Sequence, residues 1–220
     1  DTLKLVHLRY NSNLSRVRLG KHYLYDWLPQ AKDWTMCASI DGTGWIGEFI
    51  RTGLKWDEWD KNFREGVALP GGHDKMLMDL TLTGPGMLDL KNFFDYAIEL
   101  DVKIETKRMF AFHSDIVFSP MAWPRHILNR IIDENLDYIR PRATHKQETL
   151  IRELENMKNV PTFEEQWPEE HEDNFFRGRK WQRRIAEMRP DQKITIEDVY
   201  KLDSELYDWW MRVDFKDNER

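Results

Sequence analysis

Short apolar runs alternate with amphipathic stretches over the first half of the chain. The apolar runs predict strands, and apolar residues at helical spacing between them predict helices. Strands separated by helices of about 10 to 15 residues favour β-α-β units and a parallel sheet, because parallel neighbours need a crossover connection. The predicted strands are Leu3–Tyr10, Thr35–Ile40, Lys75–Thr83 and Val102–Met109, and helices are expected within Tyr23–Ala31, Ile46–Val67 and Leu88–Leu100.

From Pro120 onward the pattern is helical throughout. Apolar residues at helical spacing begin near Ile127, a charged helix is predicted at Gln147–Lys158, and a last helix lies within Asp191–Asp208. Four strands fit before residue 112, fewer than a closed eight-stranded barrel needs. Because the chain begins at Asp1 with strand-like residues immediately after it, we expect part of a larger fold. The predicted fold is α/β, with a partial (β/α) barrel over residues 1–120 and a helical C-terminal region over 121–220.

Composition excludes several classes of protein. The formal net charge of -6 opposes general attraction to a phosphate backbone, so nucleic acid is not an expected partner. No apolar run reaches the length of about 18 residues that a spanning helix needs, so no membrane association is predicted. The single cysteine, Cys37, lies in an apolar run and is expected to be a small buried hydrophobe. These features predict a soluble, cytoplasmic protein.

Candidate chemistry lies where the predicted strands end. Ligands of parallel α/β sheets bind at the carboxyl ends of the strands. The same residue types also make ordinary turns and caps, so each alone has a structural explanation. Polar residues and glycine at these ends are Asn11, Asn13, Ser39, Asp41, Thr83, Gly84, Lys107 and Arg108.

One stretch is more specific than its parts. The run Ser39-Ile40-Asp41-Gly42-Thr43-Gly44 is followed by Glu48-Phe49-Ile50-Arg51 and then by Trp56-Asp57. This sequence resembles the fourth strand and following loop of radical S-adenosylmethionine (SAM) enzymes, in particular the group with a Twitch or SPASM-like C-terminal region. The run from Arg9 to Leu14 is similar to the third strand of that family. The resemblance covers residues 3–66 and extends more loosely to Pro124.

The resemblance implies a cofactor site. Ser39 and Arg51 would bind the amino-acid end of SAM, with the planar guanidinium of Arg51 pairing with the carboxylate. Asn13 and Asp41 would complete the polar wall. The full-length protein would also hold a four-iron four-sulfur cluster and carry out an oxidoreductase-type radical modification of a peptide, a sugar or another small molecule.

The chain departs from the family at the cluster. The family binds its cluster with a Cys-x3-Cys-x2-Cys loop after the first strand, because three thiolates leave one iron open to chelate the cofactor. That loop is absent, and Cys37 alone cannot replace it. The chain is therefore interpreted as the C-terminal part of such an enzyme, inactive alone. No metal-ligand set is predicted, and Gly71-Gly72-His73-Asp74 is interpreted as a surface turn.

Two other functions remain open. The first is a catalytically silent binding module that engages a protein or nucleic acid through its helical tail, including the basic stretch Arg177–Arg184. The structural interpretation of this stretch is that it forms a solvated helix face or that its charges pair with the acidic run before it. The second is a small α/β enzyme that uses only groups present here, such as Asp41 and Lys107. Catalytic residues, substrate and oligomeric state are not assigned.

Overall fold

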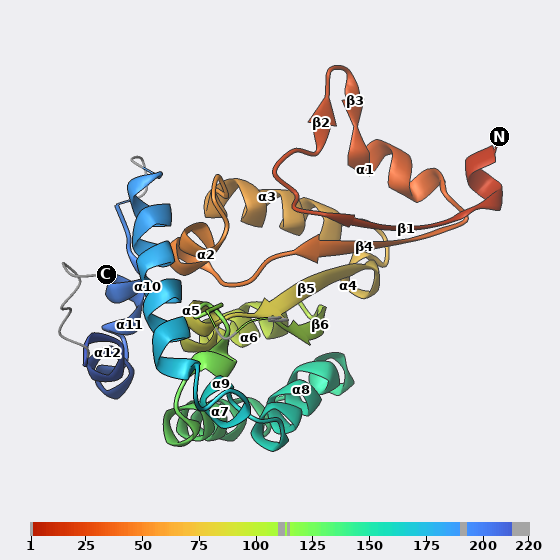
Figure 1. Ribbon diagram of the computed structural model, residues 1–220. Helices are drawn as coiled ribbons and strands as arrows, with labels where there is room; N and C mark the ends of the chain where they lie inside the picture. The colour runs from red at the N-terminus through yellow and green to blue at the C-terminus, as the bar shows by residue number, and fades with distance from the viewer. Residues whose placement is uncertain (1, 110–112, 114, 190–192, 213–220) are drawn as a thin grey trace.

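The protein is built around a four-stranded parallel sheet with helices along it (Figure 1). The computed structural model describes residues 2–109, 113, 115–189 and 193–212. The strand order across the sheet is β1-β4-β5-β6, and a separate two-stranded hairpin, β2-β3, projects from one end of the molecule. The strands are β1 (His7–Ser12), β2 (Arg18–Leu19), β3 (His22–Tyr23), β4 (Asp33–Ser39), β5 (Met76–Leu82) and β6 (Lys103–Arg108).

Helices fill every connection between the parallel strands and most of the chain after them. In the first half they are η1 (Thr2–Leu5), α1 (Leu24–Trp27), η2 (Leu28–Gln30), α2 (Gly44–Ile50), α3 (Trp56–Val67), α4 (Gly72–Lys75), α5 (Gly84–Leu88) and α6 (Leu90–Glu99). In the second half they are η3 (Pro120–Ala122), α7 (Arg125–Ile139), η4 (His145–Gln147), α8 (Glu148–Asn159), α9 (Phe163–Gln166), α10 (His171–Glu187), α11 (Ile196–Tyr200) and α12 (Ser204–Met211). None of the described helices is long and apolar enough to cross a bilayer.

Alternation along the strands gives the sheet two different faces. Successive side chains of a strand point to opposite faces, so every second residue shares one environment. On one face α3 packs against β5, and α8 packs against β6. The strand residues of this face belong to one hydrophobic core that runs from Leu14 to Trp210. They are Trp34, Met36 and Ala38 of β4, Met76, Met78, Leu80 and Leu82 of β5, and Ile104 of β6.

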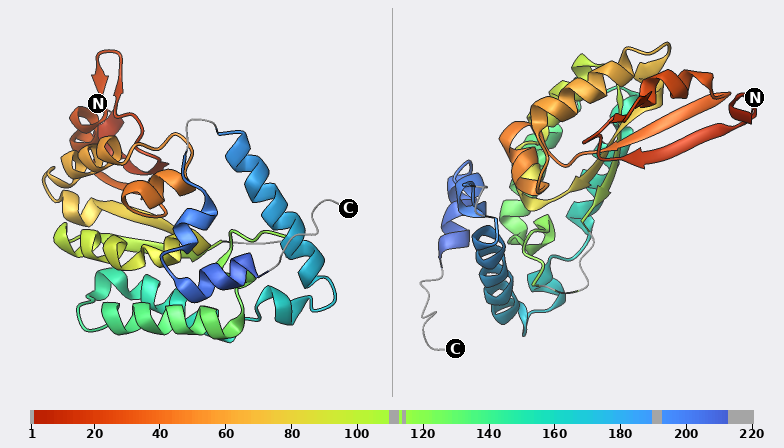
Figure 2. Two further views of the ribbon diagram at one scale, coloured as in Figure 1. Left: turned by 90° about the vertical axis from the view of Figure 1, so that its left-hand side faces the viewer. Right: turned by 90° about the horizontal axis from the view of Figure 1, so that it is seen from above.

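The helices after residue 120 are joined directly to the sheet. Gln147 Nε2 donates to the carbonyl oxygen of Val102 at 3.1 Å, and Thr149 Oγ1 donates to that of Ile104. These bonds fix the start of α8 beside the edge strand β6. Helices α10 and α11 lie elsewhere, in front of the carboxyl ends of the strands, as Figure 2 shows.

The first strand lies further along the chain than predicted. Leu3 and Leu5 belong to η1, and β1 continues past Tyr10 through Asn11 and Ser12, two residue types that favour turns. Those residues pair with the neighbouring strand, Asn11 opposite Cys37 and Ser12 opposite Ala38. Pairing with a buried strand therefore outweighs the local turn preference of Asn and Ser, because each pair satisfies backbone hydrogen bonds.

The last predicted helix is two helices, α11 and α12. The chain turns at Lys201–Asp203, and the side chain of Asp203 accepts a hydrogen bond from Leu206 N at 2.9 Å, which caps α12. The apolar stripe continues through both helices, so the sequence pattern does not reveal the break between them. The cap residue, Asp203, is also a residue type found on helix surfaces. Asp191, where the prediction began, lies outside the described residues.

Candidate functional site

The face of the sheet opposite the helices is polar at its carboxyl end. Because parallel pairing fixes the register, these polar residues form two adjacent levels across the strands. Ser39, Asp79 and Glu105 are aligned at one level, and Thr81 is aligned with Lys107 at the next. The apolar residues between them in sequence belong to the core on the other face. A charged set of side chains is thus presented on an otherwise apolar strand framework.

Asp79 is the centre of the first level. Its carboxylate accepts from Lys107 Nζ at 2.9 and 3.0 Å, and from Ser39 Oγ at 3.3 Å. The side chain of Asp79 is 15% exposed, whereas that of Lys107 is 57% exposed. The ammonium group of Lys107 is therefore open to solvent and to a ligand, while Asp79 holds it over the sheet.

Asp41 links the loop after β4 to the second level. Its Oδ1 accepts from Thr81 N at 2.9 Å, and its Oδ2 accepts from Arg51 Nε at 2.7 Å. The residue is only 7% exposed, so both bonds lie in a largely dry environment that strengthens them. Asp41 therefore fixes the direction of the Arg51 guanidinium relative to the sheet.

The glycine loop after β4 folds tightly onto α2. A Cβ atom on Gly47 would lie 2.3 Å from the carbonyl oxygen of Gly42, a distance that no side chain tolerates. Thr43 donates from both its backbone nitrogen and its hydroxyl to Asp89 Oδ2. Burial raises the pKa of Asp89, although these hydrogen bonds and one from Asn92 oppose that rise. The loop that carries Asp41 is thus held from a neighbouring element.

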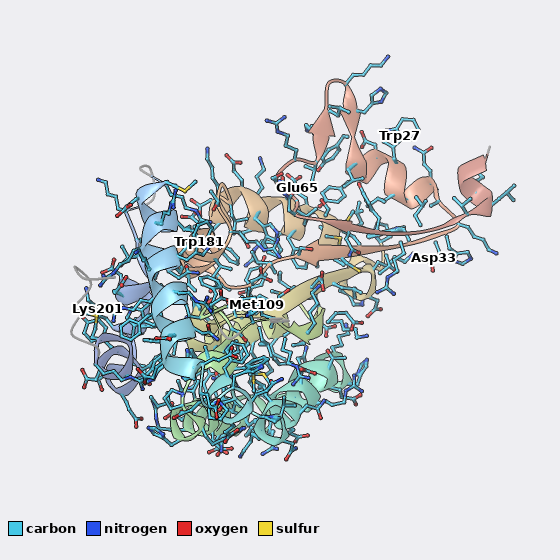
Figure 3. The ribbon with its side chains drawn as sticks, in the orientation of Figure 1. Trp27, Asp33, Glu65, Met109, Trp181 and Lys201 are labelled. Atoms are coloured by element: carbon cyan, nitrogen blue, oxygen red, sulfur yellow. The ribbon has the colours of Figure 1, made fainter. Side chains whose placement is uncertain are left out.

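A cavity of about 1050 Å³ opens at the carboxyl ends of the strands. Its floor includes Asp41 and Thr81, and its outer wall is formed by α10 and α11. Trp181 on α10 lines the cavity and remains 55% exposed; in Figure 3 it lies on the side of α10 that faces the sheet. The volume is at the upper end of the range for small-molecule and cofactor sites.

The structure brings three of the four predicted site residues to this region. Arg51 contacts Asp41 directly, and Ser39 lies one level below, on Asp79. Ser39 and Arg51 are not part of the cavity lining, which Asp41 enters. Asn13 is exposed and accepts hydrogen bonds from Ser15 N at 3.1 Å and Ser15 Oγ at 2.9 Å, so it caps a turn beyond β1.

Sequence reasoning missed Asp79 and the wall formed by α10. The signal for Asp79 was present, since Met78-Asp79-Leu80-Thr81-Leu82 alternates apolar and polar residues and so predicts one polar face. No comparable signal identified Trp181, because its position over the sheet depends on the whole C-terminal region. Lys107 pairs with Asp79 rather than with Asp41, so those two candidate groups of a small α/β enzyme are engaged separately.

The chain's residues do not fit an iron-sulfur cluster. Its single cysteine, Cys37, is buried within β4, as predicted from the apolar run around it. Among the described residues there is no group of three or more His, Cys, Asp or Glu side chains arranged to hold a metal ion. His73 contacts the neighbouring Asp74 at 3.1 Å at the start of α4.

Comparison of the chain with protein-family models, with curated proteins and with solved structures finds no match.

Proposed function

We propose that this chain is part of a radical SAM enzyme and that the carboxyl end of its sheet binds SAM. The observation that carries the proposal is the 2.7 Å bond between Arg51 Nε and Asp41 Oδ2. These residues are ten positions apart, and the resemblance assigned both to one cofactor site. They meet at the carboxyl end of a parallel sheet, which is where a ligand of such a sheet is expected to bind.

Arg51 has the geometry to bind a carboxylate. Asp41 engages only Nε, and within the described part of the chain neither terminal nitrogen of the guanidinium donates a hydrogen bond to the protein. The side chain is 29% exposed, so these nitrogens are accessible. They would form a bidentate pair with the carboxylate of SAM, while Ser39 and the polar level around Asp79 face its more distant groups. In this proposal Asp41 is a positioning residue.

The strand order supports a partial (β/α) barrel. The parallel strands lie across the sheet in the order in which they occur in the chain, with helices in each connection. This arrangement repeats in (β/α) barrels, whereas a doubly wound sheet reverses its order at a switch point. The polar sheet face would then line the barrel interior, next to the substrate, which we propose is a peptide or a small molecule.

The cluster belongs to residues beyond these 220 in this proposal. A four-iron four-sulfur cluster supplies the electron that cleaves SAM when it is bound, and it needs more thiolates than one buried cysteine offers. The residues of this chain would bind and orient SAM and shield it from water. A reducing, cytoplasmic setting suits both the cluster and the free thiol.

The test is a calorimetric titration of SAM into the chain and its variants. Arg51→Ala should weaken binding about 10- to 100-fold, because a charge-assisted hydrogen-bonded pair contributes on the order of 1.5 to 3 kcal/mol. The matched control is Arg64→Ala, which removes an arginine whose Nε also pairs with a carboxylate, Asp60, at 2.8 Å. That control should leave the affinity unchanged.

Decarboxylated SAM sharpens the assignment. If Arg51 pairs with the cofactor carboxylate, wild type and Arg51→Ala should bind the decarboxylated compound equally. If Arg51→Ala still weakens the binding of decarboxylated SAM, then Arg51 does not pair with the cofactor carboxylate. Absence of SAM binding by the wild-type chain, together with absence of a cysteine loop in the coding sequence upstream of Asp1, would remove the proposed function.

The structure of the helical tail limits which basic residues could bind a partner in the binding-module alternative. The basic stretch of α10 does not form one surface, since Arg179 is 1% exposed and packs with its guanidinium 5.4 Å from the centre of the Trp210 ring. Lys180 and Arg184 remain exposed. Salt-dependent nucleic-acid binding that is lost on reversing these two charges would favour this alternative.

A further inference from the structure

The segment from Arg9 in β1 to Lys32, just before β4, carries an excess of positive charge. From Arg9 to Lys32 the sequence has five lysines and arginines and a single carboxylate, Asp26, in a protein whose formal net charge is -6. All five cations are exposed: Arg9, Arg16, Arg18, Lys21 and Lys32. We call Arg16, Arg18 and Lys21, which lie in the β2-β3 hairpin or within two residues of it, the hairpin patch.

None of these cations forms an ion pair with a carboxylate of the described residues. Elsewhere, arginines form networks, such as Arg130 with Asp203, Glu205 and Glu134 at 2.8 Å. In the patch, Arg18 instead stacks 3.9 Å over the Tyr23 ring. Ion pairing neutralises much of the positive charge on other surfaces, so the hairpin patch keeps a local positive field.

Exposed rings accompany the cations. Trp27 is 45% exposed and Tyr10 is 43% exposed, and the His22 ring lies 5.9 Å from that of Trp27. Trp27 lies on the outer side of α1, and the hairpin projects away from the body of the molecule (Figure 3). Cations interleaved with exposed aromatic rings match the backbone and the base faces of a single-stranded nucleic acid.

We propose that the hairpin patch binds single-stranded nucleic acid, with its cations on phosphates and with Trp27 and Tyr10 stacked on bases. The exposed rings favour this ligand over an acidic peptide, which offers carboxylates but few faces for stacking. The net charge of -6 does not prevent binding, because the Debye length is about 8 Å at physiological ionic strength and distant carboxylates are screened. The β2-β3 hairpin lies apart from α10 in Figures 1 and 2, and no residue of the patch lines the cavity, so this inference does not depend on SAM binding.

The test measures fluorescence anisotropy of fluorescein-labelled oligothymidylate and oligouridylate of about 12 nucleotides, titrated with the chain at several salt concentrations. If about three phosphates are neutralised, a plot of the logarithm of the binding constant against the logarithm of the salt concentration should have a slope of about -2. Arg16→Glu combined with Lys21→Glu should weaken binding at least about tenfold, because two attractive contacts become repulsive. Trp27→Ala should weaken it by about fivefold or more through lost stacking.

The control reverses the same number of charges on α10, with Lys180→Glu and Arg184→Glu. This double variant changes the net charge equally and should bind like wild type. Circular dichroism checks that both double variants are folded. Equal losses in the two double variants, or binding that does not depend on salt, would overturn the proposal. Displacement of the oligonucleotide by poly-glutamate at equal charge concentration would instead assign the patch to an acidic protein.

Discussion

Gly178 sets how closely α10 approaches the segment before η3. A Cβ atom at this position would lie 2.1 Å from the carbonyl oxygen of Asp115 and 2.5 Å from Val117 Cγ1. The first of these atoms is backbone, which cannot rotate away as a side chain can. The close approach of α10, the helix that forms one wall of the cavity, therefore requires a residue without a side chain at position 178.

Gly178→Ala should lower the free energy of unfolding by about 1 to 3 kcal/mol, the usual cost of overpacking. The gain in helix propensity from Gly to Ala is at most about 1 kcal/mol and opposes this loss. Urea denaturation followed by circular dichroism measures the difference. Lys180→Ala, an exposed change on the same helix, is the control and should change stability little; an equally stable Gly178→Ala protein would mean that α10 can shift without cost.

Individual site residues were predictable to different degrees. Asp41 and Arg51 could be selected from a contiguous motif, and they meet because the loop and α2 that carry them are local structure. The pairing of Asp79 with Lys107 joins residues 28 positions apart on different strands, and it depends on a register that sequence alone does not give. Asn13 was assigned to the polar wall by the resemblance, but the chain turns there, and its side chain accepts a hydrogen bond within that turn.

At the scale of elements, the loop between β4 and α2 depends on a residue of the next crossover, the one between β5 and β6. Asp89, between α5 and α6, accepts from the backbone nitrogen and hydroxyl of Thr43, and Asn92 Nδ2 donates to its other oxygen at 2.9 Å. Asp89 is 3% exposed, so little water can replace these bonds. The glycine loop is thereby attached to the helix layer.

Asp89→Ala should destabilise the protein by about 1 to 3 kcal/mol, because the Thr43 nitrogen loses a buried acceptor. It should also weaken SAM binding if the proposed site is right, since the same loop carries Asp41. Urea denaturation and calorimetry measure the two effects separately. Asp57→Ala, an exposed carboxylate at the start of α3, is the control; unchanged stability in the Asp89 variant would show that water satisfies the loop.

Element prediction worked where a short apolar run marks a buried strand and failed where tertiary pairing or capping decides. The run at Thr35–Ile40 was predicted as a strand from its continuous apolar character, and β4 buries three consecutive residues, Met36 to Ala38. The strand predicted at Lys75–Thr83 is β5, which likewise buries Met76 to Met78. The β2-β3 hairpin has only two residues in each strand, too few for a period to show. Its position is fixed instead by long-range contacts, such as the hydrogen bond from Tyr23 to Glu65 on α3 at 2.5 Å.

At the scale of the whole molecule, Arg125 joins three parts of the C-terminal region. From the start of α7 it donates to the carbonyl oxygens of Lys158 at 3.2 Å and Val160 at 2.7 Å, and it forms a two-bond pair with Glu165 on α9. The same carboxylate of Glu165 accepts from Thr162 N at 2.9 Å. Arg125 therefore links α7 to the end of α8 and, through the carboxylate of Glu165, to α9.

The stability that Glu165 contributes should be lost in acid. Arg125, and then the Thr162 backbone, lower the pKa of Glu165 from 4.5 to about 2. Because the folded-state pKa is the lower one, the contribution is present above pH 4.5 and disappears as the pH falls toward 2. Glu165→Gln should therefore cost most near pH 7, by no more than about 1 kcal/mol because the side chain is 44% exposed, and progressively less below pH 4.5. Urea denaturation at a series of pH values measures this difference.

The control is Glu164→Gln, which changes an exposed neighbour with no arginine partner in the described chain. The cost of this control substitution should not vary with pH in this way. A cost of Glu165→Gln that stays constant down to pH 3 would assign the stability to packing rather than to charge.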